Sequence, residues 1–115
     1  MPVFNCIWQG DANETAIRSL LHVSSDVFYI NVSGPETVSV YSTAKKFAEL
    51  LNKEALFCDE PMGEALISNC GKMAELFGYP SVSLETMIKW QAEWIRAGGR
   101  SLGKPTHFEE KKGEY

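Results

Sequence analysis

The chain has few of the residues that build metal and redox sites. Its 115 residues include three cysteines and two histidines. Cys6, Cys58 and Cys70 are widely spaced and form no C-x-x-C motif, and neither His22 nor His107 has a third ligand type at a zinc spacing. An odd number of cysteines also fits poorly with a disulfide framework. We therefore expect reduced thiols, a cytoplasmic protein and no metal site.

Long apolar runs and an excess of basic residues are also missing. No stretch reaches the roughly 18 apolar residues needed to cross a membrane, and the first residues lack the basic and apolar regions of a signal peptide. With 11 Lys and Arg against 15 Asp and Glu, the net charge is −4. Nucleic acids and anionic membranes both call for a basic surface, so we expect neither as a partner.

Glycines are present, but not in the strings that cradle phosphates. Neither G-x-G-x-x-G nor G-x-x-G-x-x-G occurs. Gly98 and Gly99 follow a predicted helix, whereas a phosphate-binding loop precedes one. We therefore expect this chain alone to bind no cofactor.

What is present predicts an α/β fold, with a small sheet of about three strands packed by about four helices. Residues 3–8, 27–32 and 55–58 are predicted as strands, because they are apolar and rich in β-branched or aromatic side chains. Residues 27–32 are apolar almost throughout, so we expect both faces of that strand to be covered, and we expect it to run parallel to residues 55–58. Residues 1–100 are predicted to form one domain and residues 101–115 an extended tail.

Helices are predicted where apolar residues recur at helical spacing after a capping residue. The expected caps are Asp11 (after a turn at Gln9 and Gly10), Ser39 or Thr37, Ser68, and Ser83. The first helix is expected to bury Ala16, Ile17, Leu20 and Leu21. The apolar face of the third helix is expected to consist of Met73, Leu76 and Phe77, and a left-handed Gly78 is expected to end that helix. One side of the fourth helix is expected to carry Leu84, Met87, Ile88, Gln91, Trp94 and Ile95. Residues 59–66 are predicted as a loop.

The first predicted strand ends beside a group of side chains that could meet a ligand. Trp8, Gln9 and Asp11 follow that strand, and ligands of α/β proteins are often bound where strands end. We predict these three as substrate-binding residues. Asp11 and Glu14 could also be an acid/base pair, although a capping box explains both more simply.

Four strings resemble a known family. They are Trp-Gln-Gly-Asp-Ala-Asn-Glu at 8–14, Asn-Val-Ser-Gly-Pro-Glu-Thr at 31–37, Glu-Leu-Phe-Gly-Tyr-Pro at 75–80, and Leu-Gly-Lys-Pro-Thr-His-Phe-Glu at 102–109. In this order they resemble the C-terminal, substrate-binding domain of the NAD-dependent epimerases and dehydratases, which are extended short-chain dehydrogenases. The resemblance implies a domain that closes over a small-molecule substrate, while NAD or NADP is held by a separate Rossmann half.

The resemblance therefore implies a truncated member that is not catalytic alone and that meets a Rossmann-domain partner or associates with itself. A stand-alone regulatory or protein-interaction module that reuses the fold is the alternative. A third hypothesis is an autonomous oxidoreductase, because Tyr41 and Lys45 form a Tyr-x-x-x-Lys motif. Phe28 and Tyr29 stand where that motif needs a serine upstream, which argues against it.

Two departures from the family concern the substrate. Sugar-nucleotide members place one arginine shortly before the Asp11-type position and another before the Ser68-type helix. The sequence reads Phe4-Asn5 near the first place and Ala65-Leu66-Ile67 near the second. A buried diphosphate needs charged or backbone donors, so these departures argue against a nucleotide-sugar substrate.

Overall fold

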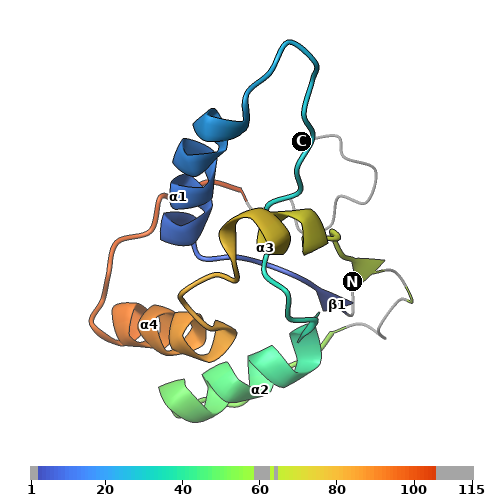
Figure 1. The fold of residues 1–115 in the computed structure, drawn as a ribbon. Coiled ribbons are helices and arrows are strands. Elements are labelled where there is room, and N and C mark those ends of the chain that lie inside the picture. Colours follow the sequence, from blue (N-terminus) through green and yellow to red (C-terminus); the bar gives the residue numbers. More distant parts are fainter. Residues whose placement is uncertain (1–2, 59–62, 64, 106–115) are drawn as a thin grey trace.

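The computed structural model describes residues 3–58, 63 and 65–105, and within these ranges the protein is a small α/β structure (Figure 1). Three short strands form a mixed sheet, accompanied by four α-helices and one 3-10 turn in the described part of the chain. The strands are β1 (Val3–Phe4), β2 (Val38–Ser39) and β3 (Ala65–Leu66). The helices are α1 (Gln9–Ser19), continued by the 3-10 turn η1 (Leu20–His22), α2 (Val40–Leu51), α3 (Gly71–Phe77) and α4 (Leu84–Arg96).

Strand β1 is the centre of the sheet. It pairs antiparallel with β2, where Phe4 lies opposite Val38, and parallel with β3, where Phe4 lies opposite Leu66. Part of the first predicted strand is thus confirmed, and the number of strands agrees with the prediction. Strand β3 lies where the sequence predicted a loop.

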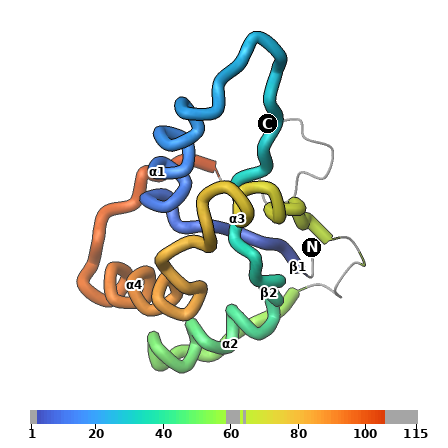
Figure 2. Tube along the Cα trace, in the orientation of Figure 1, coloured from blue at the N-terminus to red at the C-terminus, as the bar shows by residue number. Residues whose placement is uncertain are grey.

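Two of the predicted strands are wrong. Residues 27–32 follow an open path without a strand partner among the described residues, and residues 55–58 form no strand either (Figure 2). Side chains of both segments are exposed, including Val27, Tyr29 and Leu56. A β-branched and aromatic composition makes a segment suitable for a sheet, but it does not supply the neighbouring strand that the backbone groups need.

Helices α2 and α4 lie side by side, and both begin at the predicted caps. The Ser39 hydroxyl accepts the Ser42 backbone N–H at 3.2 Å, and the Ser83 hydroxyl accepts that of Thr86 at 3.2 Å. Each such bond satisfies one of the backbone donors that a helix leaves free at its first turn. Gly78 has φ 79° after α3, as predicted.

The predicted caps of the other two helices are wrong. Helix α1 begins at Gln9 after Trp8, two residues before Asp11, so Gln9 and Gly10 are helical and not a turn. Helix α3 begins at Gly71, three residues after Ser68. The Gly71 N–H donates a hydrogen bond to the side chain of Asn69 at 2.9 Å. In both cases a polar residue stands near the helix start but bonds to a different segment of the chain.

The buried apolar core is small and lies between the sheet, α3 and α4. Its members among the described residues are Val38, Cys70, Met73, Ile88 and Ala92. Met73 and Ile88 are buried as predicted, whereas Leu76, Trp94 and Ile95 of the same predicted faces are exposed. The predicted apolar face of α1 is wrong, because Ala16, Ile17, Leu20 and Leu21 are exposed, while Asp11 and Thr15 are the buried residues of that helix. Helical spacing identifies an apolar face, but it does not say what covers that face.

None of the helices in the described ranges combines the length and the apolar character that crossing a membrane requires. Residues 101–105 form neither helix nor strand, as expected for the tail, and residues 106–115 lie outside the described residues.

Candidate functional site

The three predicted substrate-binding residues lie together at the start of α1. Trp8 is the residue before the helix, Gln9 is its first residue, and Asp11 lies in its first turn. Trp8 and Gln9 are exposed, but only 6% of Asp11 is exposed. The three residues are therefore neighbours at the start of α1, but two of them face solvent and the third is buried.

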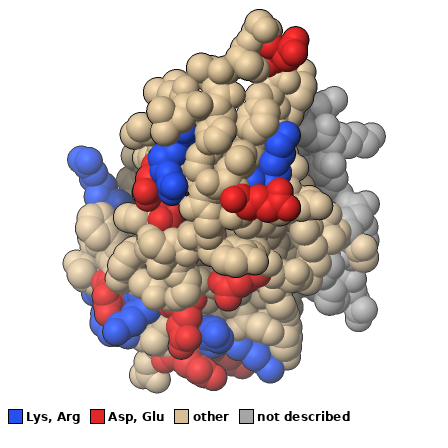
Figure 3. Space-filling model, in the orientation of Figure 1, with Lys and Arg blue, Asp and Glu red and all other residues tan. Residues whose placement is uncertain are grey.

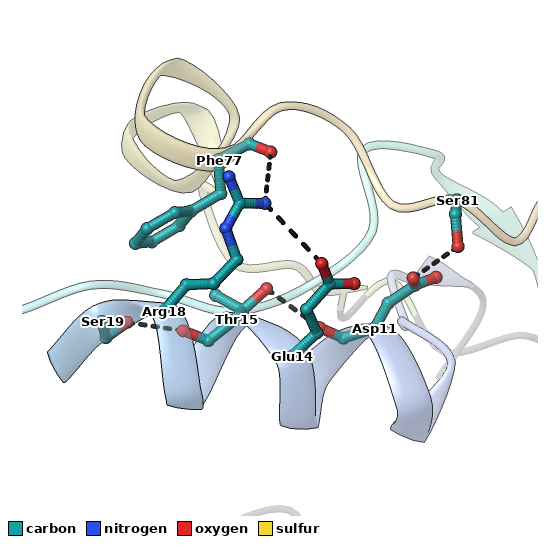
Figure 4. A network of polar contacts seen from close by, with 7 residues as sticks. All are labelled: Asp11, Glu14, Thr15, Arg18, Ser19, Phe77 and Ser81. Carbon is teal, nitrogen blue, oxygen red and sulfur yellow. Dashed lines mark hydrogen bonds and ion pairs between the residues drawn. The ribbon is translucent and has the colours of Figure 1, made fainter. Parts of the chain in front are cut away.

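The Asp11 carboxylate joins α1 to the segment before α4 (Figure 4). Its Oδ1 accepts a hydrogen bond from the Ser81 hydroxyl at 2.7 Å, and its Oδ2 accepts one from the Val82 backbone N–H at 3.0 Å. Both oxygens are thus used within the protein. Direct contact between Asp11 and a substrate stays a prediction, and the observed role of Asp11 is to position the 81–82 segment against α1.

These contacts favour the charged form of Asp11. The hydrogen bond from Ser81 lowers the pKa of the carboxyl below its ordinary value, partial burial opposes this, and the backbone N–H groups of Val82 and Ser81 lower the pKa further. A carboxylate that accepts several hydrogen bonds remains ionised and is a poor general acid near neutral pH.

A row of polar contacts continues along the same side of α1. The Thr15 hydroxyl donates to the Asp11 carbonyl at 2.9 Å, and the Ser19 hydroxyl donates to that of Thr15 at 2.8 Å. Arg18 donates to the Phe77 carbonyl at 3.2 Å, and its guanidinium carbon lies 5.2 Å from the centre of the Phe77 ring. Figure 4 shows Arg18 reaching from α1 to the end of α3. Because a helix leaves its last carbonyls without partners, Arg18 satisfies one of them.

Two cavities flank the 79–81 segment. A cavity of about 170 Å³ lies between α1 and the end of α3, and its lining includes Asp11, Glu14 and Arg18. A second cavity of about 210 Å³ is lined by Cys6, Glu36 and the start of α4, among others. Residues 79–81 line both cavities, so the segment that Asp11 positions forms a wall of each.

The second cavity contains a thiol and a carboxylate with distinct roles. Burial raises the pKa of the Cys6 thiol, and the charge of Glu36 raises it further, so the thiol is kept in its neutral form. Glu36 accepts the Leu84 N–H at 3.1 Å, at the first residue of α4. A negative charge at a helix N-terminus is stabilising, so Glu36 anchors α4 beside the cavity.

Trp8 lies beside α4 and over its own helix. Its ring meets that of Trp90 edge-on, with ring centres 5.6 Å apart and planes at 68°. The same ring lies so close to Gly10 that a Cβ there would collide with it. Neither of the two cavities is lined by Trp8 or Gln9, so these residues offer an open aromatic and amide surface next to the cavities.

The connection between β1 and α1 does not fit a dinucleotide. A pyrophosphate bound between a strand and a helix needs close approach to backbone N–H groups and no opposing charge. Here the Trp8 ring covers Gly10, and the Asp11 carboxylate occupies the first turn of the helix. A phosphate at this place would be repelled by Asp11.

Sequence reasoning missed the importance of Asn5. Its side-chain N–H groups donate to the Gly34 carbonyl at 3.0 Å and to the Ser68 carbonyl at 2.8 Å, and its Oδ1 accepts the Ser68 N–H at 3.0 Å. The sequence around a single asparagine in a predicted strand does not indicate what its side chain binds, because its partners are distant in the sequence. Asn5 belongs to the stretch in which the resemblance leads us to expect a phosphate-binding arginine, and its side-chain amide binds backbone groups.

The other residues considered for chemistry, Tyr41, Lys45 and His22, pack against aromatic rings of this chain. On α2, the Lys45 Nζ lies 4.4 Å from the centre of the Tyr41 ring, and that ring stacks on Phe57 with centres 4.8 Å apart. His22 lies against the rings of Phe28 and Phe77, with ring centres 6.3 Å and 5.4 Å away. Within the described residues no three potential ligand side chains gather as a metal site would require, and His107 lies outside them.

Comparison of the chain with protein-family models, with curated proteins and with solved structures finds no match in any of the three.

Proposed function

We propose that the chain is the substrate-binding portion of an NAD-dependent epimerase/dehydratase-like protein, which lacks the dinucleotide-binding half and does not catalyse a reaction alone. One observation carries the proposal: three of the four strings that resemble the family meet around the same two cavities. String 8–14 lines the first cavity, string 31–37 lines the second, and string 75–80 lines both. Segments separated by up to about 70 positions would gather in this way if they served one site.

The proposed ligand is a small molecule without a diphosphate. Cavities of about 170 and 210 Å³ are small beside the roughly 300–1,000 Å³ of complete ligand pockets, which fits a site that is finished by another domain. Arg18 is the cation in the lining of the first cavity, and it already binds the Phe77 carbonyl and lies 3.9 Å from Glu14. A diphosphate would therefore compete for a guanidinium that is in use.

The missing half is proposed to supply the cofactor. The β1–α1 connection repels phosphate, and large apolar side chains of α1 and of residues 23–32 are exposed. Large exposed apolar patches on soluble proteins mark interaction sites. Both features are expected if NAD or NADP is held by a Rossmann-type partner that docks on this chain.

Cofactor titration of the chain, alone and with its partner, tests the proposal. The partner to be tested is any dinucleotide-binding half that the coding neighbourhood of this sequence contains. We expect no saturable binding of NADH to the chain alone and saturable binding to the complex. Saturable NADH binding by the isolated chain, or turnover of a substrate by it, would contradict the proposal, as would the absence of any such half from the coding neighbourhood.

A regulatory module is the second candidate, because both cavities are lined by this chain's own residues. Such a module would bind a small ligand without any partner. Thermal unfolding in the presence of a small-metabolite library separates the two candidates: a ligand that raises the Tm of the isolated chain favours the module.

A further inference from the structure

The second cavity, between the residues that follow β1 and the start of α4, has an apolar lining with a single formal charge. The apolar side chains in this lining are those of Ile7, Pro35, Pro80, Val82 and Met87. Its one charged side chain is that of Glu36, and the described residues of the lining include no lysine and no arginine. The charge of this cavity is therefore negative.

The carboxylate of Glu36 has capacity for another partner. Its Oε2 accepts the Leu84 N–H at 3.1 Å, and a carboxylate can accept further hydrogen bonds at its other oxygen. Besides burial, the charge of Glu36 raises the pKa of the Cys6 thiol, so this charge acts on the lining of the cavity. In Figure 3, acidic rather than basic side chains reach the surface between α3 and the helices below it.

The N-terminus of α4 does not reverse this negative charge. A helix N-terminus attracts anions through its free backbone donors, but here two of those donors are occupied. The Val82 N–H is bound by Asp11, and the Leu84 N–H is bound by Glu36. Glu85 places another carboxylate in the first turn of the helix. An anionic ligand would therefore be repelled, whereas a cation would be attracted.

The volume of the cavity suits a compact molecule. The cavity has about 210 Å³, and an apolar cavity of about 150 Å³ is large enough to bind benzene. A single ring with a short side chain would fit. Tyr79 also belongs to the lining and is 74% exposed, and an aromatic ring at the rim of a site attracts a cation.

We propose that the second cavity binds a small primary amine, whose apolar body lies against Met87 and Pro80 and whose ammonium group binds the carboxylate of Glu36. The inference deepens the proposed function: it rests on it in placing the ligand site at these cavities, and it adds the chemical class of the ligand.

Cys6 provides a reporter inside this cavity. A bound ligand should shield its half-buried thiol from iodoacetamide. Tryptic digestion after labelling separates the cysteines, because Cys6 falls in residues 1–18, whereas Cys58 and Cys70 fall in residues 54–72. Cys58 is exposed and lines neither cavity, so its labelling rate is the internal control. Mass spectrometry of the two peptides gives the rates.

Three probes of one shape and different charge test the proposal on the isolated chain. They are 2-phenylethylamine, the neutral 2-phenylethanol and the anionic phenylacetate. We expect about 10 mM amine to slow the labelling of Cys6 by about fivefold or more, as for a Kd on the order of 1 mM. The alcohol should slow it by about twofold or less, and phenylacetate should have no effect. The labelling of Cys58 should not change.

A matched pair of variants tests the role of the charge. Glu36→Gln removes the charge but keeps an oxygen that can accept the Leu84 N–H. We expect protection by the amine to fall to the level of the alcohol in this variant. Glu14→Gln removes a carboxylate that lines only the first cavity and should leave the protection unchanged. Rates with and without amine are compared within each variant, and unfolding midpoints give the folding control.

The outcomes separate this inference from the proposed function. Equal protection by the amine and the alcohol, protection by neither, or equal slowing at Cys58 would each show that the cavity is not an amine site. The same conclusion would follow if Glu36→Gln kept full protection by the amine. Since the test uses the chain alone and no nucleotide, these results leave the proposed function standing. If the complex with the dinucleotide-binding half binds no NADH, the proposed function fails while the amine result still holds.

Discussion

Asp11 and Ser81, seventy positions apart, share a hydrogen bond of 2.7 Å that joins the first turn of α1 to the segment before α4. Val82 adds a second bond to the same carboxylate, so one buried side chain positions the wall shared by two cavities.

Removal of this carboxylate should destabilise the fold. We expect Asp11→Ala to lower the free energy of unfolding by about 2–4 kcal/mol, because two partly buried donors lose a charged acceptor. Urea denaturation measures the change. Glu14→Ala is the matched control, since the Glu14 carboxylate is exposed and lies 3.9 Å from Arg18, and such surface pairs contribute about 0–1 kcal/mol. Equal losses in the two variants would show that Asp11 has no special role.

The acid stability of the protein should depend on the same residue. In the folded protein the pKa of Asp11 lies below its usual 3.8. The hydrogen bond from the Ser81 hydroxyl has the largest effect, and the backbone N–H groups of Val82 and Ser81 lower the pKa further. The stabilisation is therefore fully present above that usual value and is lost as the pH falls through the lower folded pKa. Asp11→Asn should make the unfolding free energy less dependent on pH below about pH 4. Parallel pH curves for the two proteins would contradict this assignment.

Gly34 should tolerate no side chain. A Cβ at this position would collide with the backbone carbonyl of Cys6, which cannot move aside as a flexible side chain could. We expect Gly34→Ala to cost about 1–3 kcal/mol of stability. Among the described residues no atom lies within 4 Å of a Cβ built at Gly63, so Gly63→Ala should change the unfolding free energy by less than about 0.5 kcal/mol. A neutral Gly34→Ala variant would contradict the close approach.

Mutation should destabilise the protein strongly in the buried core and very little at the exposed apolar residues that follow α1. Met73 is almost fully buried, so Met73→Ala should cost about 2–5 kcal/mol. Leu21 is 86% exposed, so Leu21→Ser should change the stability of the isolated chain by less than about 0.5 kcal/mol. A large loss of stability with Leu21→Ser in the chain alone would show that Leu21 is covered within this protein.

Local signals predicted much of the helical structure. Ser39 and Ser83 were predictable as helix caps because each hydroxyl accepts a backbone N–H only three residues further along the chain, in the first turn of the amphipathic helix that follows. Gly78 was predictable for the same reason, since a positive φ after a helix is a local requirement. Helical spacing identified Met73 and Ile88 as buried, but it also placed Leu76, Trp94 and Ile95 on the apolar faces of α3 and α4, and these three are exposed.

Long-range partners were not predictable in this way. Asp11 and Ser68 resemble caps in the sequence, but Asp11 bonds to residues 81 and 82, and the Ser68 N–H bonds to Asn5. Residues 27–32 have the composition of a strand, yet strand formation depends on a neighbour that is absent from the described residues. The prediction that Trp8 and Gln9 bind substrate stays a prediction, since their exposure is compatible with it and does not test it.

The fold depends on the amide group of Asn5, and its conversion to a carboxylate would be damaging. Its amide nitrogen faces two backbone carbonyls, those of Gly34 and Ser68. Deamidation would replace that donor with a negatively charged oxygen, so an attraction between three distant segments would become a repulsion. A sample in which Asn5 had been converted to aspartate would therefore have the segments around Gly34 and Ser68 released from the end of β1, and its stability would no longer be that of the original protein.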